Sequence, residues 1–476
     1  MTGCPTSTRR LPVAAALAFA LAGAPESWAT DSATAKRPAV VPVTSCADDG
    51  SPGTLRSAVG LASSGDTVDL GGLSCSTITL GNGAIESNVD DLRIAGPGAS
   101  RLTIDAQHAS RAFLHGGAGT LTVARVTVAN GSYTPIFGGA YGGGCVASTG
   151  SVLMVDAVAT GCVATASGPI KGGAVFVFGG VELYGSTITG SSAISLAGAT
   201  GPAALGGAIF AYRDISLHHS VVSGNGVSAP SGFVYGGALR SEHLIRIKFS
   251  SVRNNRATTD AETDPHGFGG GISSLGASVF YSTFEGNFAD ASGAIDVRAH
   301  PYTTVVENST ISGNHARILG GAMLADNDLV IQNCTIAFNK SGPAGGGGLV
   351  VYGSYIAFQS TILADNEPSG PIAAADLDGT SGVLGGTSLI QVSGLPVPPD
   401  TIALDPELAP LAANGGPTRT HALSATSPAI DRGTDTWEPF DQRGRGFPRK
   451  IGVAVDIGAY ERDTDTVFRD GFDAML

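Results

Sequence analysis

Four charged residues stand at matching places in two repeats of the chain, and their types suit acid–base chemistry. Arg240 and Glu242 form the first pair. Asp296 and Arg298 take the same two places two repeats later. An Arg base beside a carboxylate, or a pair of carboxylates, can cleave a glycosidic linkage, so these four are the candidate catalytic set. Opposite charges on neighbouring strands also form solvated ion-pair ladders, and both interpretations stay open.

A second set of side chains has the types that contact sugar rings or a partner protein. Aromatic rings stack on such ligands, and cations and histidines hydrogen-bond them. The aromatic members have an alternative role, in which nearby long segments cover them. The candidate ligand-binding residues are Phe176, Tyr184, Phe210, Tyr212, His218, Arg246 and Lys248.

These residues must be positioned by a repeated unit, best seen at residues 308–340. It holds a Gly pair, three short apolar runs, and an Asn five residues after an anchoring Ser or Cys. Its copies follow one another at spacings of 23 to 34 residues. A repeat of this size is typical of a solenoid, because one unit cannot bury its apolar face alone. The copies begin at Gly142, Gly172, Gly206, Gly236, Gly269, Ser292, Gly320 and Gly346.

Aligned copies have apolar residues at every second position of each run, which is typical of strands with one buried face. Three runs per copy predict an all-β fold, a right-handed parallel β-helix of the pectate-lyase-like type with three strands per turn and about ten to twelve turns. Five aligned amides would then hydrogen-bond along the axis in a structural role. They are Asn225, Asn255, Asn287, Asn314 and Asn339, and Asp365 is the next member by spacing.

Composition and charge narrow the function. Glycine makes up 69 of 476 residues, which suits a turn-rich solenoid. The net charge of −13 argues against nucleic acid and anionic membranes as partners. Arg9 and Arg10 before the apolar run 11–24 predict a secretory signal cleaved after Ala29, and the run is too short to span a bilayer. We therefore expect an exported monomer without a transmembrane segment, at the cell surface, associated with the outer membrane, or extracellular.

Export permits disulfides. Cys46–Cys75 would staple the first coil, and Cys145–Cys162 would link two strands of one coil. Cys334 replaces the anchoring Ser in its copy and is expected to be a buried free thiol. The cysteines lack the close pairing of zinc sites, and we expect no metal and no cofactor.

The expected division of the chain follows its composition. Residues 54–62 can form an amphipathic helix that caps the first coil. Long segments between strands, at 193–205, 227–234 and 257–268, are expected as loops on one side of the solenoid. The divisions are a signal peptide (1–29), a leader (30–45), the β-helix with its N-terminal cap (46–366), a transition segment (367–403), an irregular C-terminal block (404–461) and a polar tail (462–476).

Three stretches resemble known families. The GGA-plus-aliphatic copies and FEGN at 284–287 resemble the repeats of polymorphic outer membrane proteins, which implies a surface-displayed β-helix used in adhesion. The block from DPELAPLAANGGPTRTHALSATSPAIDRG to DIGAYE is similar to the choice-of-anchor Q domain, which follows β-helices in bacterial surface proteins. The opening SCADDGSPGTLRSAV fits the same group.

The charged residues of this C-terminal block are expected to form a buried ion network that folds it over the last turn, with calcium binding as the alternative. They are Asp431, Asp441, Arg443, Arg449, Asp456 and Glu461.

Three functional hypotheses remain. The first is a non-catalytic adhesin that contacts a polysaccharide or a neighbouring or host cell surface. The second is a polysaccharide lyase or glycosidase that uses the candidate catalytic set. The third is a rigid surface spacer without a ligand. The chain has no nucleophile elbow, zinc helix motif or phosphate loop that would favour another enzyme class.

Overall fold

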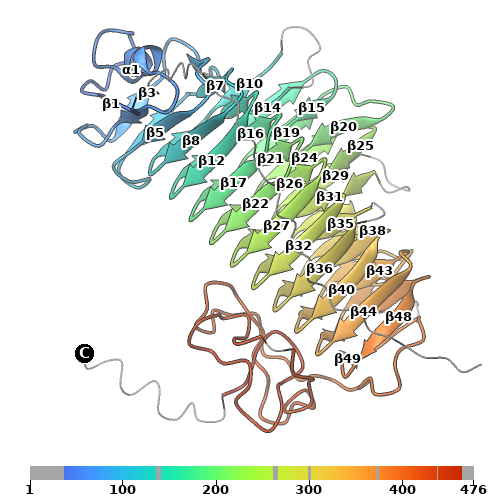
Figure 1. The fold of residues 1–476 in the computed structure, drawn as a ribbon. Coiled ribbons are helices and arrows are strands. Elements are labelled where there is room, and N and C mark those ends of the chain that lie inside the picture. Colours follow the sequence, from blue (N-terminus) through green and yellow to red (C-terminus); the bar gives the residue numbers. More distant parts are fainter. Residues whose placement is uncertain are drawn as a thin grey trace, which may run out of the picture. The chain divides into compact units, whose positions relative to one another are not determined.

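The computed structural model describes residues 37–135, 141–260, 266–298, 302–370, 375–436 and 438–463. From Pro38 onward they belong to one compact unit. The predicted signal peptide, the first part of the leader and nearly all of the polar tail lie outside the described residues. Parallel strands stack along an axis in turn after turn (Figure 1), which confirms the predicted right-handed parallel β-helix.

Sheet A is one of three sheets that enclose the core, and its strands pair in parallel from the first turn to the last. Its strands are β1 (Val40–Pro42), β2 (Thr67–Asp69), β5 (Leu92–Ala95), β8 (Thr120–Ala124), β12 (Ser151–Val155), β17 (Val181–Tyr184), β22 (Ile215–His218), β27 (Leu244–Lys248), β32 (Gly276–Phe280), β36 (Thr303–Glu307), β40 (Asp328–Gln332), β44 (Tyr355–Gln359) and β48 (Gly382–Gly386).

Sheet B follows sheet A in each turn after a sharp corner. Its strands are β3 (Thr77–Thr79), β6 (Thr103–Asp105), β9 (Thr127–Ala129), β13 (Val158–Thr160), β18 (Thr187–Thr189), β23 (Val221–Ser223), β28 (Ser251–Arg253), β33 (Thr283–Glu285), β37 (Thr310–Ser312), β41 (Thr335–Ala337), β45 (Ile362–Ala364) and β49 (Leu389–Ile390).

Sheet C completes the turn and leads into the next strand of sheet A. Its strands are β4 (Ile85–Ser87), β7 (Phe113–His115), β11 (Val146–Ser148), β16 (Val175–Val177), β21 (Ile209–Ala211), β26 (Leu239–Ser241), β31 (Ile272–Ser274), β35 (Ile295–Val297), β39 (Met323–Ala325), β43 (Leu349–Val351) and β47 (Leu377–Gly379).

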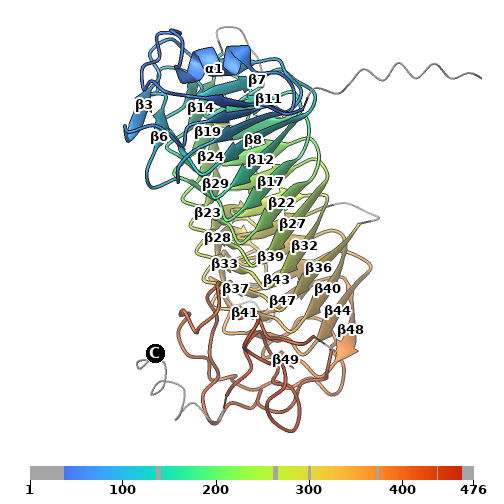
Figure 2. The same ribbon diagram turned by 60° about the vertical axis from the view of Figure 1, so that its left-hand side comes forward.

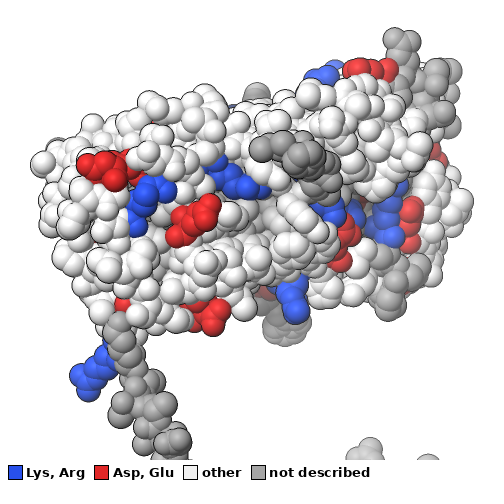
Figure 3. Space-filling view, turned by 90° about the horizontal axis from the view of Figure 1, so that it is seen from above, with Lys and Arg blue, Asp and Glu red and all other residues white. Residues whose placement is uncertain are grey.

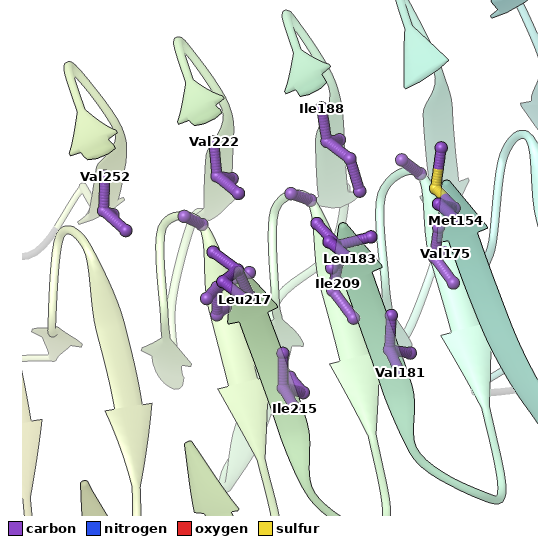
Figure 4. Close-up of a cluster of buried hydrophobic side chains, with 14 of the residues drawn as sticks. Met154, Val175, Val181, Leu183, Ile188, Ile209, Ile215, Leu217, Val222 and Val252 are labelled. Carbon is purple, nitrogen blue, oxygen red and sulfur yellow. The ribbon is translucent and has the colours of Figure 1, made fainter. Parts of the chain in front are cut away.

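The core lies between these three sheets and follows the period-two alternation. In β22, Ile215 and Leu217 are buried while the residues between and after them face outward. The next turn places Ile245 and Ile247 directly beside them. Inward side chains of successive turns therefore form continuous rows (Figure 4).

The Gly pairs lie just before the strands of sheet C. The two positions of a pair require glycine for different physical reasons. Gly236 has a φ of +68°, a left-handed conformation that side chains disfavour. A Cβ on Gly237 would lie 2.2 Å from the carbonyl oxygen of Gly270 in the next turn. Ser292 takes the left-handed place in the copy that lacks the first glycine, with a φ of +60°.

The five aligned Asn side chains lie in one buried ladder. In each step the Oδ1 of one Asn accepts from both the backbone N–H and the Nδ2 of the Asn in the preceding turn, at 2.9 to 3.1 Å. The ladder continues to Asn366, whose Nδ2 donates to Asp376 at 2.8 Å. Burial raises the pKa of Asp376 to about 6.

The last copy is shifted by one residue from the predicted alignment. Ile356 and Phe358 are the inward residues of β44, where the alignment placed Tyr355 and Ala357, and Phe358 outward. The error comes from matching Ser360 to the anchoring serines. Thr361 is the true anchor, because its Oγ1 accepts from the N–H of Cys334 at 3.4 Å. For the same reason Asn366, and not Asp365, continues the amide ladder.

The N-terminal cap and the cysteines agree with prediction. α1 (Leu55–Leu61) begins after Thr54, whose side chain accepts from the N–H of Ser57, and it buries Ala58 and Val59 against the first turn. The disulfides Cys46–Cys75 and Cys145–Cys162 are both present, and Cys334 is a buried free thiol.

A fourth sheet, sheet D, was not predicted; it is formed by the segments that connect sheet B to sheet C in each turn, and part of it covers the outer face of sheet C. One group of its strands follows sheet B: β10 (Ser132–Tyr133), β14 (Val163–Ala166), β19 (Ser192–Ser195), β24 (Gly226–Ala229), β29 (Arg256–Thr259), β34 (Phe288–Ala291), β38 (His315–Leu319), β42 (Lys340–Ser341) and β46 (Glu367–Pro368). The other group returns toward sheet C: β15 (Ile170–Lys171), β20 (Pro202–Leu205), β25 (Phe233–Tyr235) and β30 (Gly267–Phe268).

Sheet D corrects the expectation of loops at 193–205, 227–234 and 257–268, although 261–265 lie outside the described residues. The two groups of strands enclose a small apolar core of their own, built mainly from alanine and valine. Ala193, Ala204 and Val227 are among its buried members. Short apolar side chains let two backbones approach closely, so segments with few large residues still fold as strands.

The C-terminal block packs along the outer face of sheet B, beside β37, β41 and β49 (Figure 2), and its contacts extend from β33 to β49 instead of being limited to the last turn as predicted. Gln442 and Arg419 reach the hydroxyl groups of Thr283 and Thr310. An apolar contact joins Ile362 of sheet B to the block. The outward residues of sheet B from β33 onward are mostly small hydroxyl or aliphatic side chains, and the exception, Glu285, forms an ion pair with Arg419 of the block.

Five of the six ionic residues predicted for the buried network are buried, and Asp431 is only partly buried. Arg443 pairs with Asp441 at 2.6 Å. Arg449 donates to the carbonyl of Asp456 at 2.7 Å, and Glu461 lies 3.9 Å from it. Burial raises the pKa of the Glu461 carboxyl to about 8, and the nearby Asp456 adds to this.

Candidate functional site

An open groove of about 580 Å³ runs along the outer face of sheet A. Its floor is made by outward residues of β8, β12, β17, β22 and β27, so it crosses five turns. We call it the sheet A groove. The floor combines small residues, such as Ser151, Gly180 and Ser216, with the larger side chains of Leu153, Glu182 and Arg246. Its wall is the corner before β22 and the matching corner one turn later, with Arg213, Asp214 and His243.

Asp214 holds the polar side chains of this wall together. Its carboxylate accepts from Nδ1 of His243, from Nη1 of Arg246, and from the N–H of Leu244. Burial opposes the charge of Asp214, but the bonds from Arg246 and His243 keep its pKa below the usual value. Because His243 donates through Nδ1, its Nε2 keeps a lone pair when the ring is neutral.

A column of side chains borders the floor where sheet A nears sheet B. Tyr184, His218 and Lys248 are in register on three successive strands. The rings of Tyr184 and His218 stack at 4.7 Å, and Tyr184 is 41% exposed. Burial lowers the pKa of His218; nearby Glu182 opposes this, and Lys248 adds to it. His218 is therefore a neutral ring at pH 7, and the positive charge of the column comes from Lys248.

A second aromatic pair stands at the opposite edge, where sheet C turns into sheet A. Tyr212 lines the groove and stacks on Phe178 at 5.2 Å. Lys171 donates to the Tyr212 hydroxyl at 2.9 Å, which fixes this ring. The groove is thus flanked by an aromatic pair on each side.

Two predicted ligand-binding residues are out of reach of a ligand. Phe176 is 2% exposed and Phe210 is 0% exposed. They stack at 5.8 Å on the outer face of sheet C and pack under Leu205 of sheet D. Of the two roles weighed for these aromatics, coverage by a neighbouring segment describes this pair.

The four candidate catalytic residues lie together, on sheet C and outside the groove. Glu242 accepts from Arg240 at 3.0 Å, and Arg298 donates to Asp296 at 2.6 Å. Ser273 joins the two pairs, since it accepts from Arg240 and donates to Asp296, both at 2.8 Å. In this series of hydrogen bonds, each charged side chain has an opposite charge beside it, as in a cross-strand ion-pair ladder.

Rings of sheet D lie over this ladder. The Arg298 guanidinium sits 3.8 Å from the centre of the Phe268 ring, and Arg240 sits 5.2 Å from that of Tyr235. Asp296 is 1% exposed. The position between stacked aromatic rings and a sheet favours a structural role for Asp296.

Sequence reasoning missed Asp214 and Arg213, and it gave His243 no role. They stand at corners, where the period-two rule does not assign a direction. A usable signal was present, because His243 follows Asp214 by 29 residues, close to the length of one turn. Residues one turn apart are neighbours in a solenoid, so a corner Asp and a corner His at that spacing predict a contact.

Charged side chains are sparse on the face seen in Figure 3, where Lys and Arg mostly lie beside Asp or Glu. The described residues contain no group of three or more His, Cys, Asp or Glu side chains placed to share a metal ion. No helix within the described part of the chain is long and apolar enough to cross a membrane.

No family model and no curated protein matches the chain. The resemblances to choice-of-anchor Q domains and polymorphic outer membrane proteins therefore stay predictions. Among solved structures, the chain is similar to the crystal structure of pectate lyase Pel9A, with 14% sequence identity and a TM-score of 0.42. The match covers 89% of this chain and 96% of the lyase chain. We draw nothing about activity from a likeness at this level.

Proposed function

We propose that the protein is an exported β-helix that binds an extended polysaccharide in the sheet A groove, as an adhesin or carbohydrate-binding surface protein. The observation that carries this proposal is the shape and lining of the groove. It follows the solenoid axis across five strands, which at roughly 4.8 Å per strand corresponds to roughly 20 Å. That length suits several linked sugar units more than one small molecule.

The lining supports a sugar ligand. Stacked rings at both edges, Tyr184 with His218 and Tyr212 with Phe178, offer flat apolar surfaces. Glu182 and Ser216 add acceptors and donors between them. Carbohydrate sites commonly combine ring stacking with hydrogen bonds of this kind.

Two disulfides support a location outside the reducing cytoplasm. The signal-like N-terminus and the resemblance of the C-terminal block to choice-of-anchor Q domains support display at the cell surface or at the outer membrane. At that place a rigid solenoid would hold its groove away from the surface and toward a polysaccharide or a neighbouring cell. We propose that it acts there as a monomer without a cofactor.

A glycan array with the purified protein tests this function. We expect retention of at least one polysaccharide of several units, and loss of that retention in Tyr184→Ala. Gln359→Ala is a matched control, because Gln359 is an outward residue of β44 on the same sheet but outside the groove. Equal retention by both variants would place the ligand elsewhere. No retention by any glycan would favour the rigid spacer.

Cleavage of the bound polysaccharide is a second candidate, and one contact favours it. His243 is oriented by Asp214 inside the groove, an arrangement that can serve a general base. A depolymerisation assay with His243→Gln and Asp296→Ala separates the possibilities. New reducing ends or unsaturated sugars that vanish only in His243→Gln indicate groove catalysis. Loss only in Asp296→Ala would assign catalysis to the predicted set on sheet C.

A further inference from the structure

The middle of the solenoid carries a positive belt in a negative protein. Residues 213–256 contain six Lys or Arg and two Asp or Glu, a net charge of +4, while the whole chain has −13. All of these residues are described. The belt spans two successive turns, from the corner before β22 to β29, so its charges lie on different sheets.

Arg213 and Arg246 line the sheet A groove, and Lys248 borders it two residues beyond Arg246 on β27. The charge of these three cations is incompletely neutralised. Arg213 is exposed and has no ion pair among the described residues. Arg246 gives only Nη1 to Asp214, which leaves Nε and Nη2 without a protein acceptor in the described chain. Lys248 is exposed and makes no ion pair among the described residues, and the Phe249 and Tyr281 rings lie near its ammonium group.

The acids of the groove do not cancel these cations. Asp214 is already shared between Arg246 and His243. Glu182 lies one turn away from Ser216 and two turns away from Arg246 in the same outward column. A ligand that follows the groove axis therefore meets fixed positive charge at Arg213, in the corner before β22, and again on β27.

We infer that the ligand of the sheet A groove is an anionic polysaccharide, whose carboxylate or sulfate groups pair with Arg213, Arg246 and Lys248. This inference rests on the proposed function and adds the chemical class of the ligand. Arg is suited to the role because its planar guanidinium keeps several donors free for an oxyanion after one is used. The stacked Tyr184 and His218 would hold the sugar ring next to the anionic group that Lys248 contacts.

A polysaccharide fits this surface better than a nucleic acid. The positive charge is confined to two successive turns, and the rest of the chain is negative and would repel a long duplex. A short anionic stretch of a sugar chain can meet the belt while its remaining units follow the neutral floor at Ser151 and Gly180.

The test compares four probes of similar length: dextran, dextran sulfate, alginate and duplex DNA. Their binding is measured by calorimetry at low and moderate salt. We expect alginate or dextran sulfate to bind at least roughly tenfold more tightly than dextran, since hydrogen bonds to charged groups are stronger than those between neutral groups. Added salt should weaken this binding. The two charged polysaccharides separate carboxylate from sulfate recognition.

Two double variants locate the contact. Arg246→Gln/Lys248→Gln removes two cations from sheet A and should weaken binding roughly tenfold or more. Arg253→Gln/Arg256→Gln removes two cations from the same turn on sheets B and D, and should change it less than roughly twofold. Thermal unfolding of each variant verifies the fold, and Lys248→Gln alone replaces the first double variant if that variant unfolds.

The possible results distinguish a failure of this inference from a failure of the proposed polysaccharide-binding function. Dextran binding as tight as that of the charged probes, with Arg246→Gln/Lys248→Gln unaffected, overturns the inference and keeps the polysaccharide groove. Equal losses in the two double variants, or duplex DNA bound as tightly, also overturn it, because the attraction is then unspecific. Failure of every polysaccharide to bind removes the proposed function and this inference together.

Discussion

The outer faces of sheets A and C come from the same turns and carry similar residues, yet they end in different environments. On sheet C, Phe210 and Asp296 are buried beneath strands of sheet D. On sheet A, Tyr184 and Arg246 remain exposed and border a groove. Period two determines only that a residue points outward. Whether it meets solvent or another sheet depends on what packs over that face, and this decides which aromatic and charged residues can meet a ligand.

Sheet B shows the same contrast within one sheet. Thr283 and Thr310 are buried by the C-terminal block, whereas Thr187 and Ser251 in earlier turns are partly exposed. The backbone register is continuous through all of these residues. The difference in burial between these hydroxyl residues therefore comes from the segment that packs over them, and not from the strand geometry.

We expect the largest effect on the free energy of unfolding from a change in the buried aromatic pair, Phe176 and Phe210. Phe210→Ala removes a fully buried ring that stacks on Phe176 and should lower the free energy of unfolding by about 3–5 kcal/mol. Chemical unfolding followed by intrinsic fluorescence or circular dichroism measures it. A loss below about 1 kcal/mol would show that sheet D does not cover this face in solution.

We expect a smaller effect on the free energy of unfolding from a change in the ion pair of Asp296 and Arg298, which sheet D covers. Asp296→Ala leaves Arg298 and the hydroxyl of Ser273 without their acceptor, which should cost about 3 kcal/mol. Asp214→Ala on the open face should cost less than about 1 kcal/mol, because its partners are half exposed and solvent replaces the lost bonds. Similar costs for the two variants would contradict the contrast between the faces.

The border between the C-terminal block and sheet A should respond to pH. Burial and the adjacent Glu438 raise the pKa of Glu307 to about 7, and the Tyr281 hydroxyl also donates to Glu438. Because the folded pKa lies above the unfolded value near 4.5, the stabilisation is complete below about pH 4.5 and is lost as pH rises through about 7. Because solvent screens this half-buried group, we expect its pH-dependent contribution to the free energy of unfolding to be about 1 kcal/mol.

The measurement for Glu307 is the change in unfolding free energy between pH 5.5 and pH 8.5. Asp376 and Glu461, with pKa values raised by burial to about 6 and about 8, add to the slope with the same sign. The difference between the unchanged protein and Glu307→Gln isolates the pair with Glu438. An identical pH slope in both proteins would rule out a shared proton at this border.

The smallest effect on stability should come from the open aromatic column. Tyr184→Ala should change the unfolding free energy by less than about 0.5 kcal/mol, since its side chain is exposed and its ring stacks on one neighbour. Its polysaccharide affinity should fall roughly threefold to tenfold if one sugar stack is lost. Large destabilisation with unchanged binding would reverse the assignment of the two faces.

The sequence by itself determined the interior of this protein. A strict repeat places like residues one above another, so the apolar rows, the amide ladder and the cap at α1 follow from spacing alone. The two disulfides and the buried thiol also agree with their places in the repeat. The single slip, at Ser360 and Thr361, arose where two neighbouring hydroxyl residues fit the same column.

Only the tertiary structure decided what covers the exterior. Sheet D is built from segments of unequal length, and the C-terminal block contacts sheet B from residues more than a hundred positions away, as between Thr310 and Gln442. Neither arrangement recurs at a fixed spacing from one turn to the next, so the sequence repeat does not predict it. The physical reason is that inward packing is set by neighbours one turn apart, whereas coverage depends on long-range contacts between segments with no common spacing.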